Sequence, residues 1–595
     1  MSAIAEEGSV VRHRRQLTVL ATLALLAVSS FGAAGATRAA GPPVNPAPPP
    51  TRVLIVLFDQ MVPAYADKFD MPNFRRIRDA GTEFKQAYLG YMASETVIAH
   101  NVITSGQSPR HMGWVDEAYR DSANLFGKGV DAMHITGDLS LTDFGTLVDH
   151  EGYPKLADYL HTAYPGTKFI TVGEKSYAVE SATASHGDIA VRLSSRRTDV
   201  SVATGCPNLS VDGAGTNGQF REPTGKNVPS YLTTPGKGSG ACGRFFINSS
   251  SSNDYGTKTA PPSWMYPEDG NRFFPGTDAS AQAGHLGGDT WVADAAIAMM
   301  DEPWSGMFVT LGAIDKAGHM WGAQNDNGGG TCTTGAEQTH VKCAAANADV
   351  QFGKLLDKVK AVDTAKGGET LVVLTADHGA TYGQAFNGKT TSGAGDTNWY
   401  YAPNGVYDAG ACAPSTSCPD TTTYNNPSPA LQPLRDTNNL AFVYGSTAVE
   451  AWLVDRTQAK MQEAAAAGLQ LAGSIASYYR SGSGFTLFGT NKMTQPEKDW
   501  WKDHGQEIVD TMAAPSGPDI VVLMHDKTSY GVYGDHGGAQ ESVQRVPMVF
   551  WAPSLAYGVS TGRTFHTTDV MPTILATMGI ELTAPVDGTA RRLGR

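Results

Sequence analysis

The fold is decided by residues 53–59, Val53-Leu-Ile-Val-Leu-Phe-Asp59, an unbroken apolar run that ends in a carboxylate. A strand with one solvent-exposed face alternates apolar and polar residues, whereas a strand buried on both faces is apolar throughout. The run therefore predicts a parallel strand inside an α/β sheet. Similar runs occur at residues 169–172, 307–311, 371–374, 520–523 and 546–551.

Helical patterns lie between several of these runs. Amphipathic stretches cover roughly residues 72–80, 290–300, 344–360, 447–479 and 569–578. Strands that alternate with helices predict a doubly wound, mostly parallel central sheet with helices on both faces. The chain has 595 residues, 41% of them hydrophobic, which is enough for a large core.

Three polar blocks rich in Gly, Ser and Thr are too long to be ordinary connections. They cover residues 204–285, 323–342 and 385–435, and we expect them to be insertions in one catalytic domain spanning 51–595. The six cysteines fall in or next to these blocks. Pairing by proximity gives Cys206–Cys242, Cys332–Cys343 and Cys412–Cys418, one of fifteen connectivities. A thiolate metal site is disfavoured because no C-x-x-C occurs, so we expect disulfides formed in an oxidising compartment.

The N-terminus predicts export. Arg12, Arg14 and Arg15 precede an apolar run at 17–31 and a small-residue cleavage site at 34–36, which indicates a signal peptide over 1–36 and a Pro-rich leader over 37–50. The apolar run is short for a bilayer span, so no stable membrane anchor is expected. Ordinary secretion and twin-arginine export both remain open.

The chain is acidic, with a formal net charge of −13. Nucleic acid binding is not expected on this ground, because it needs clustered Lys and Arg. A phosphate substrate is not excluded, since bound cations can reverse the local field.

Carboxylates and imidazoles follow the predicted strands. The residues concerned are Asp59, Asp315, His319, Asp377, His378 and His536. In an open parallel sheet the carboxyl ends of the strands face one crevice, so these side chains are expected to converge. Asp and His are ligands of catalytic zinc, and six of them suffice for two metal ions. Each residue alone would be an ordinary turn or cap residue, and only their joint placement carries the argument.

The segment 94–106 predicts a helix that begins near Thr96. A hydroxyl at that point lies at the positive end of the helix dipole, which favours anions. A metal on the same oxygen would make it a nucleophile. The alternative is a plain N-cap threonine.

Six ordered motifs now suggest a family. They are Met71-Pro-Asn-Phe74, Thr96-x-x-x-His100, Asp315-Lys-Ala-Gly-His319, Ala376-Asp-His-Gly379, Asp535-His-Gly537 and Asp569-Val-Met-Pro-Thr573. Together, over residues 53–590, they resemble the alkaline phosphatase superfamily, closest to its type I phosphodiesterase/nucleotide pyrophosphatase branch.

The resemblance implies an alkaline phosphatase-like fold and two Zn²⁺ ions. One zinc would be held by Asp59, Thr96, Asp377 and His378, and the other by Asp315, His319 and His536. It also implies a phosphoric ester hydrolase for small phosphate esters, in which Thr96 attacks phosphorus and the phospho-threonine is then hydrolysed. The chain departs from the branch at Ile98-Ala99, where Pro-Asn is common, so the phosphate contact of that Asn is missing or replaced.

Lys175 and Tyr177 bear on substrate class. They occupy a stretch that resembles the K-x-R of monoesterases in this branch, with Tyr177 at the Arg position. A cation near the non-bridging oxygens favours a monoester dianion, so we expect a phosphomonoesterase. The alternatives are a phosphodiesterase/nucleotide pyrophosphatase and, for Lys175, a surface position.

Three remoter classes are disfavoured. A sulfatase needs Cys or Ser in a C/S-x-P-x-R context, which residues 94–98 lack. A phosphomutase or lipid-headgroup transferase would share the metal ligands. A catalytically dead secreted binding protein would be expected to have lost some of the ligands, all of which are present.

Overall fold

The computed structural model describes residues 48–193, 219–221, 223–233, 247–249, 288–315, 318, 340–381, 384–385, 400–401, 431–530 and 534–594. The predicted signal peptide, nearly all of the leader and most of the three predicted insertions lie outside these residues, as does His319. Cys343 is disulfide-bonded. The other five cysteines also fall outside the described part of the chain, so the proposed pairings stay predictions.

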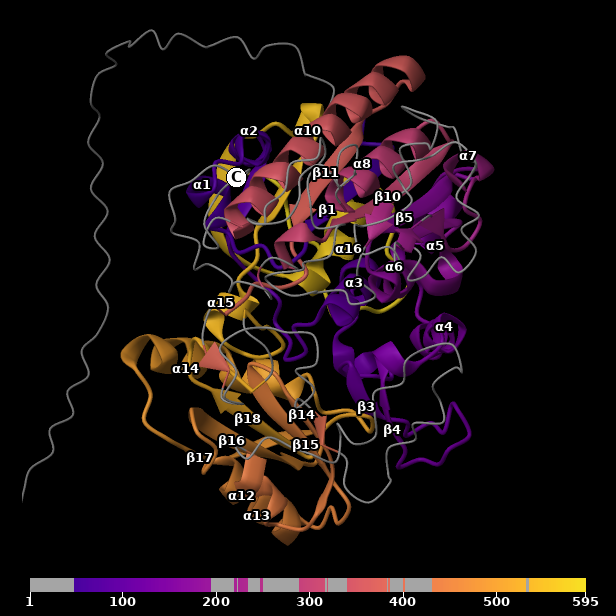
Figure 1. Ribbon diagram of the computed structural model, residues 1–595. Coiled ribbons are helices and arrows are strands. Elements are labelled where there is room, and N and C mark those ends of the chain that lie inside the picture. Colours follow the sequence, from indigo (N-terminus) through magenta and orange to yellow (C-terminus); the bar gives the residue numbers. More distant parts are fainter. Residues whose placement is uncertain are drawn as a thin grey trace, which may run out of the picture. The chain divides into compact units, whose positions relative to one another are not determined.

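A nine-stranded sheet has the order β21-β2-β20-β11-β1-β10-β5-β6-β8. Figure 1 labels β11, β1, β10 and β5, the middle of this sheet. Its strands are β1 (Arg52–Phe58), β2 (Thr82–Tyr88), β5 (Lys168–Gly173), β6 (Ile189–Leu193), β8 (Pro223–Thr224), β10 (Trp304–Leu311), β11 (Thr370–Thr375), β20 (Met548–Trp551) and β21 (Val559–His566). β1 lies between β10 and β11 and runs parallel to both. Every residue of β1 is buried, as its unbroken apolar sequence predicts.

The remaining pairings of this sheet are mixed. β10 with β5, β5 with β6, and β2 with β21 are parallel, whereas β20 is antiparallel to both β11 and β2, and β8 is antiparallel to β6. The prediction of a mostly parallel central sheet is confirmed. The expectation of a parallel strand over 546–551 was wrong in direction, because an apolar run reports burial on both faces and not the direction of the chain.

A second sheet of six strands was not foreseen. Its order is β13 (Tyr400–Tyr401), β14 (Leu440–Gly445), β15 (Ala448–Leu453), β18 (Ile520–Met524), β16 (Ser474–Ser481) and β17 (Gly484–Thr490), and every pairing is antiparallel. The predicted strand over 520–523 is therefore real but belongs to this sheet, and it is not parallel to its neighbours.

The helical interpretation of residues 447–479 was also wrong. Only α13 (Gln458–Gly468) is helical there, and strands β15 and β16 flank it. β15 reads Ala-Val-Glu-Ala-Trp-Leu and is buried on both faces, so its apolar content matches a helical period as well as a strand. The glycines at 468 and 473 mark the end of the helix and the turn into β16.

Two groups of helices pack near the nine-stranded sheet. In one, α10 (His340–Lys366) contacts α2 (Pro72–Ala80) and α8 (Gly288–Met299). In the other, α3 (Thr96–Ser105) contacts α5 (Leu156–Ala163), α6 (Ser176–Thr183) and α16 (Val570–Thr577) (Figure 1). The predicted helices over 72–80, 290–300, 344–360 and 569–578 are confirmed. In the described residues, the other helices of four or more residues are α1 (Tyr65–Lys68), α4 (Leu141–Asp149), α7 (Ser230–Thr233), α12 (Gln432–Arg435), α14 (Gln495–Asp510) and α15 (Glu541–Gln544).

No helix in the described residues combines the length and the hydropathy that a bilayer crossing needs.

Candidate active site

Three buried aspartates lie together at the carboxyl ends of neighbouring strands. Asp59 follows β1, Asp315 follows β10 and Asp377 follows β11, and none of the three is exposed to solvent. The backbone N–H of Asp59 donates to the carbonyl of Leu311 at the end of β10, at 3.0 Å. The convergence expected for parallel strands is therefore present.

Thr96 is the first residue of α3, a helix buried along its whole length. The N-cap is Glu95, which has an extended backbone and makes no side-chain cap hydrogen bond, so Thr96 is not itself the cap. The Thr96 hydroxyl lies 3.3 Å from Nε2 of His378 and 3.0 Å from Nζ of Lys175. A buried hydroxyl at a helix N-terminus thus faces both an imidazole and a cation.

His100 fixes the first turn of α3. Its Nδ1 donates to the Thr96 carbonyl at 2.7 Å, and its Nε2 accepts from the hydroxyl of Thr310 on β10 at 2.8 Å. Burial lowers the pKa of His100 to about 3, so the ring is neutral and acts as a bridge from helix to strand.

His378 and His536 stack on each other, with ring centroids 3.7 Å apart and an interplanar angle of 22°. Nδ1 of His378 donates to the Gly379 carbonyl at 2.9 Å, which leaves Nε2 unprotonated. That nitrogen lies 3.8 Å from Asp59 Oδ1 and 3.5 Å from Asp377 Oδ2. Burial and the neighbouring His536 hold the pKa of His378 well below its ordinary value.

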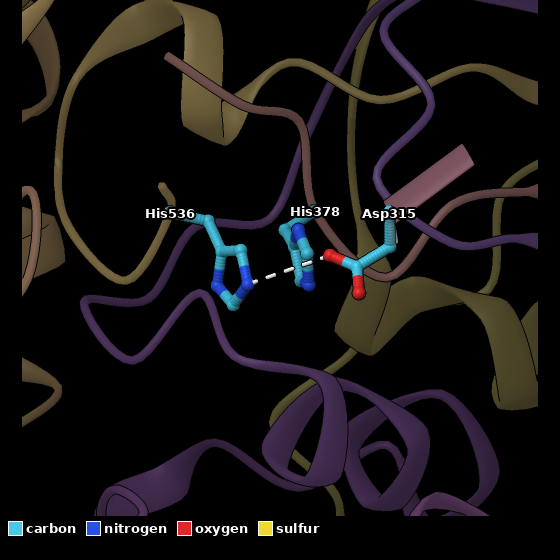
Figure 2. Close-up of side chains that lie close together, drawn as sticks. All are labelled: Asp315, His378 and His536. Carbon is cyan, nitrogen blue, oxygen red and sulfur yellow. Dashed lines mark ion pairs between the residues drawn. The ribbon is translucent and has the colours of Figure 1, made fainter. Parts of the chain in front are cut away.

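The other ring faces Asp315. Nε2 of His536 is 3.7 Å from Asp315 Oδ1, and Figure 2 marks this pair with a dashed line beside the ring of His378. Nδ1 of His536 is 2.8 Å from Oε2 of Glu95. Burial lowers the pKa of His536, but the Glu95 carboxylate more than offsets it and raises that pKa to about 10.

Lys175 lies within this group. Its ammonium is 2.8 Å from Asp59 Oδ2 and 2.7 Å from Asp315 Oδ2, in addition to its contact with Thr96, and its side chain is 17% exposed. These contacts rule out the alternative of a surface lysine. Tyr177 points its hydroxyl elsewhere, donating to the carbonyls of Leu139 at 2.7 Å and Gly137 at 3.1 Å. Its contact with substrate stays a prediction.

Gln60 was not foreseen from the sequence. Its backbone has a φ of +64°, unusual for a residue with a side chain, and its N–H donates to Asp377 Oδ1 at 3.0 Å. Its Nε2 donates to Asp315 Oδ1 and to the Gly534 carbonyl, both at 3.0 Å. Gln60 therefore braces both aspartates. The only signal in the sequence is its place directly after Asp59.

The donor atoms form two overlapping groups suited to metal ions. Asp59, Asp377 and His378 make one, and Asp315, His378 and His536 make the other, with ligand atoms within 4.8 Å of one another in each. Asp59 Oδ1 and Asp377 Oδ2 are buried and accept no hydrogen bond from the described residues. Burial, Asp377 and Asp315 raise the pKa of Asp59 well above its ordinary value despite the opposing charge of Lys175. Buried carboxylates are costly without compensating positive charge, so this cluster fits a site for divalent cations. Its nitrogen and oxygen donors are ligands that zinc accepts.

Residues 53–126 match the family model of type I phosphodiesterase / nucleotide pyrophosphatase. This match confirms the resemblance. The segment carries Asp59, Thr96 and His100, and the type I phosphodiesterase relationship supports a phosphoric ester hydrolase. No curated protein matches the chain.

Solved structures with similar coordinates include two kinds of protein. Wild-type alkaline phosphatase PafA is 15% identical, with 90% of this chain and 97% of that chain covered and a TM-score of 0.48. Human ectonucleotide pyrophosphatase / phosphodiesterase 5 is 12% identical, with coverage of 90% and 97% and a TM-score of 0.47.

Proposed function

We propose that the chain is a metal-dependent phosphoric ester hydrolase with Thr96 as its nucleophile. The observation that carries the proposal is the position of the Thr96 hydroxyl. It lies at the N-terminus of a buried helix, between Nε2 of His378 and the Lys175 ammonium, and beside two groups of metal-ligand atoms.

Two zinc ions fit the donors. Asp59, Asp377 and His378, with Thr96, would hold one, and Asp315 and His536, with His319, would hold the other. When bound, the two ions would lower the pKa of the threonine hydroxyl and neutralise the charge that develops on the phosphoryl group.

The chain's own residues support an in-line displacement. The Thr96 oxygen gives up its proton and forms a bond to phosphorus as the bond to the leaving oxygen breaks, and the leaving oxygen takes up a proton and departs as the alcohol. Water then hydrolyses the phospho-threonine to phosphate and regenerates the hydroxyl. The N-terminus of α3 favours the anionic phosphoryl group, and Gln60 with His100 holds the surrounding groups in place. Water is the only co-reactant required.

Monoesters are the substrates we favour, because Lys175 places a cation 3.0 Å from the nucleophile. A monoester dianion carries one more charge than a diester, so an ammonium there stabilises it selectively. A diesterase or nucleotide pyrophosphatase is the second candidate. It is favoured by Tyr177, which stands where a second cation is expected and directs its hydroxyl to backbone carbonyls.

Export is part of the proposal. A signal peptide over 1–36 and the disulfide at Cys343 both suit an extracytoplasmic, oxidising compartment.

Thr96→Ala tests the proposal. We expect turnover of an aryl phosphate to be lost while the fold and the bound zinc are kept, and Thr96→Ser to retain activity because it keeps a hydroxyl. Thr104→Ala is the matched control, since Thr104 is a buried threonine of the same helix whose hydroxyl donates to Ala182. If Thr96→Ala keeps more than about a tenth of kcat, the loss is under about 1.4 kcal/mol and Thr96 is not the nucleophile.

A further inference from the structure

The loop that carries His536 is tied to the two residues that precede the nucleophile. The Ser94 hydroxyl oxygen accepts from the backbone N–H groups of Gly537 at 3.0 Å and Gly538 at 2.7 Å. The Ser94 carbonyl is also 3.1 Å from Nδ1 of His536. The start of α3 and the His536 loop, more than four hundred residues apart in sequence, are therefore held together.

Glu95 completes this connection. One carboxylate oxygen, Oε2, is 2.8 Å from Nδ1 of His536, and the other, Oε1, accepts from the hydroxyl of Tyr444 at 2.9 Å. The Glu95 side chain is only 4% exposed. Gly537 has a φ of +89°, and a Cβ there would collide with Oε1 of Glu95, so the loop leaves room for this carboxylate.

We infer that Glu95 is a positioning residue for His536. Its carboxylate holds the proton on Nδ1, which leaves Nε2 to face Asp315 as a metal-ligand atom. The inference rests on the proposed function, in which His536 ligates a metal. A carboxylate behind a ligating histidine fixes its tautomer and ring orientation and raises its basicity.

If Glu95 only stabilised the fold, an uncharged hydrogen-bond acceptor for Nδ1–H of His536 would be enough. The Ser94 carbonyl already offers such an acceptor, and a buried charge is costly. The cost is increased by the surroundings, because Asp116 and Glu450 are also buried near Glu95 and Glu117 is partly buried there. Burial and then the Glu95 charge raise the pKa of Glu117 to about 8. A carboxylate at this position is explained if it fixes the tautomer and ring orientation of His536.

Tyr444 extends the arrangement to the six-stranded sheet. It lies on β14, and its hydroxyl contributes a hydrogen bond to the oxygen of Glu95 that does not face His536. The second sheet thereby fixes the rotamer of the positioning residue, and Tyr444→Phe should have a smaller effect in the same direction.

The test measures zinc affinity by competition with a chromophoric chelator in Glu95→Ala, Glu95→Gln and Glu95→Asp proteins. We expect the zinc site that includes His536 to lose about 10- to 100-fold in affinity in Glu95→Ala. Glu95→Gln, which keeps an acceptor without the charge, should lose less, and Glu95→Asp should recover part of the loss. Glu450→Gln is the matched control, because Glu450 is an equally buried glutamate and no contact joins it to His536 among the described residues.

A second readout needs no activity. In protein labelled with ¹⁵N-histidine, the Nδ1–H resonance of His536 should move in Glu95→Ala and stay in Glu450→Gln. Wild-type zinc affinity in a folded Glu95→Ala protein would overturn the inference. Wild-type protein that binds zinc but turns over no phosphoester would overturn the proposed function and leave the role of Glu95 standing, and a protein that binds no divalent metal would overturn both.

Discussion

Lys175 places its ammonium among buried carboxylates, and its role depends on the substrate. Its ammonium contacts Thr96, the proposed nucleophile, and one aspartate from each group of candidate metal-ligand atoms. We expect Lys175→Ala to cut kcat/KM for an aryl monoester by at least about tenfold, or about 1.4 kcal/mol, and to leave a bis-aryl diester nearly unchanged. Both rates are to be measured in zinc-saturated enzyme.

Lys168→Ala serves as the control for this variant. Lys168 lies at the start of β5, the strand that leads to Lys175, and pairs with Glu302 at 2.7 Å. Equal losses on both substrates in Lys175→Ala would mean that the lysine only shapes the site, and unchanged rates on both would remove it from the chemistry.

The proposed metal-ligand residues could be found from sequence, whereas the residues that support them could not. Asp59, Asp315, Asp377 and His378 each stand just after an apolar strand, so position alone selects them. Gln60, Glu95 and Tyr444 act through partners hundreds of residues away. Nothing local marks a glutamate that bonds a distant imidazole, or a glutamine with a positive φ.

Among the elements, the short helical turn Ala184–His186 depends on pH. His186 lies there with Nδ1 2.7 Å from Asp158 on α5 and Nε2 3.4 Å from Asp149 on α4. Hydrogen bonds to Asp149 and Asp158 outweigh burial and raise the pKa of His186 to about 9. The imidazolium thus joins α4 to α5, a helix that packs on strands β5 and β10 of the nine-stranded sheet.

The contribution of His186 to stability depends on pH in a definite direction. Its folded-state pKa of about 9 lies above the unfolded value of about 6.5, so protonation of His186 stabilises the folded protein. This stabilisation is complete below about pH 6.5 and is lost as pH rises through about 9. We expect His186→Asn to lose on the order of 2 kcal/mol of unfolding free energy near pH 6, seen as a lower thermal midpoint. Near pH 10 its thermal midpoint should match that of the wild type. A midpoint difference that is constant from pH 6 to pH 10 would contradict the charged pair.

Strand identity was easier to predict than strand partners. The runs at 53–58, 169–172, 307–311 and 371–374 are strands of one sheet because burial on both faces leaves a clear apolar signal. The run at 520–523 has the same signal but joins another sheet, since apolar content does not record which strand pairs with it. Strands β2 and β21 were not predicted, because their sequences mix polar with apolar residues and give no continuous apolar run.

At the scale of the whole molecule, the two sheets share one loop. Residues 534–538 carry His536, and they bond to the turn between β14 and β15 through Thr447 N–H to the His536 carbonyl at 3.2 Å and Ser446 Oγ to the Gly537 carbonyl at 2.5 Å. The same loop bonds to Ser94 before α3. The six-stranded sheet therefore supports a ligand of the proposed metal site, a role that no local sequence pattern could indicate.

Removal of the metal should therefore destabilise the contacts between the loop 534–538 and the turn between β14 and β15 more than the rest of the six-stranded sheet. A metal that binds only the assembled site stabilises the states in which the loop is in place, by about 4 kcal/mol when its concentration is a thousand times Kd. We expect chelation to speed amide hydrogen exchange at residues 444–447 and 534–538 and to leave the turn between β16 and β17 unchanged, because that turn makes no contact with the loop among the described residues. Added zinc should restore the protection. Exchange that rises evenly across both sheets, or that does not change at the loop, would show that the metal does not couple the second sheet to the site.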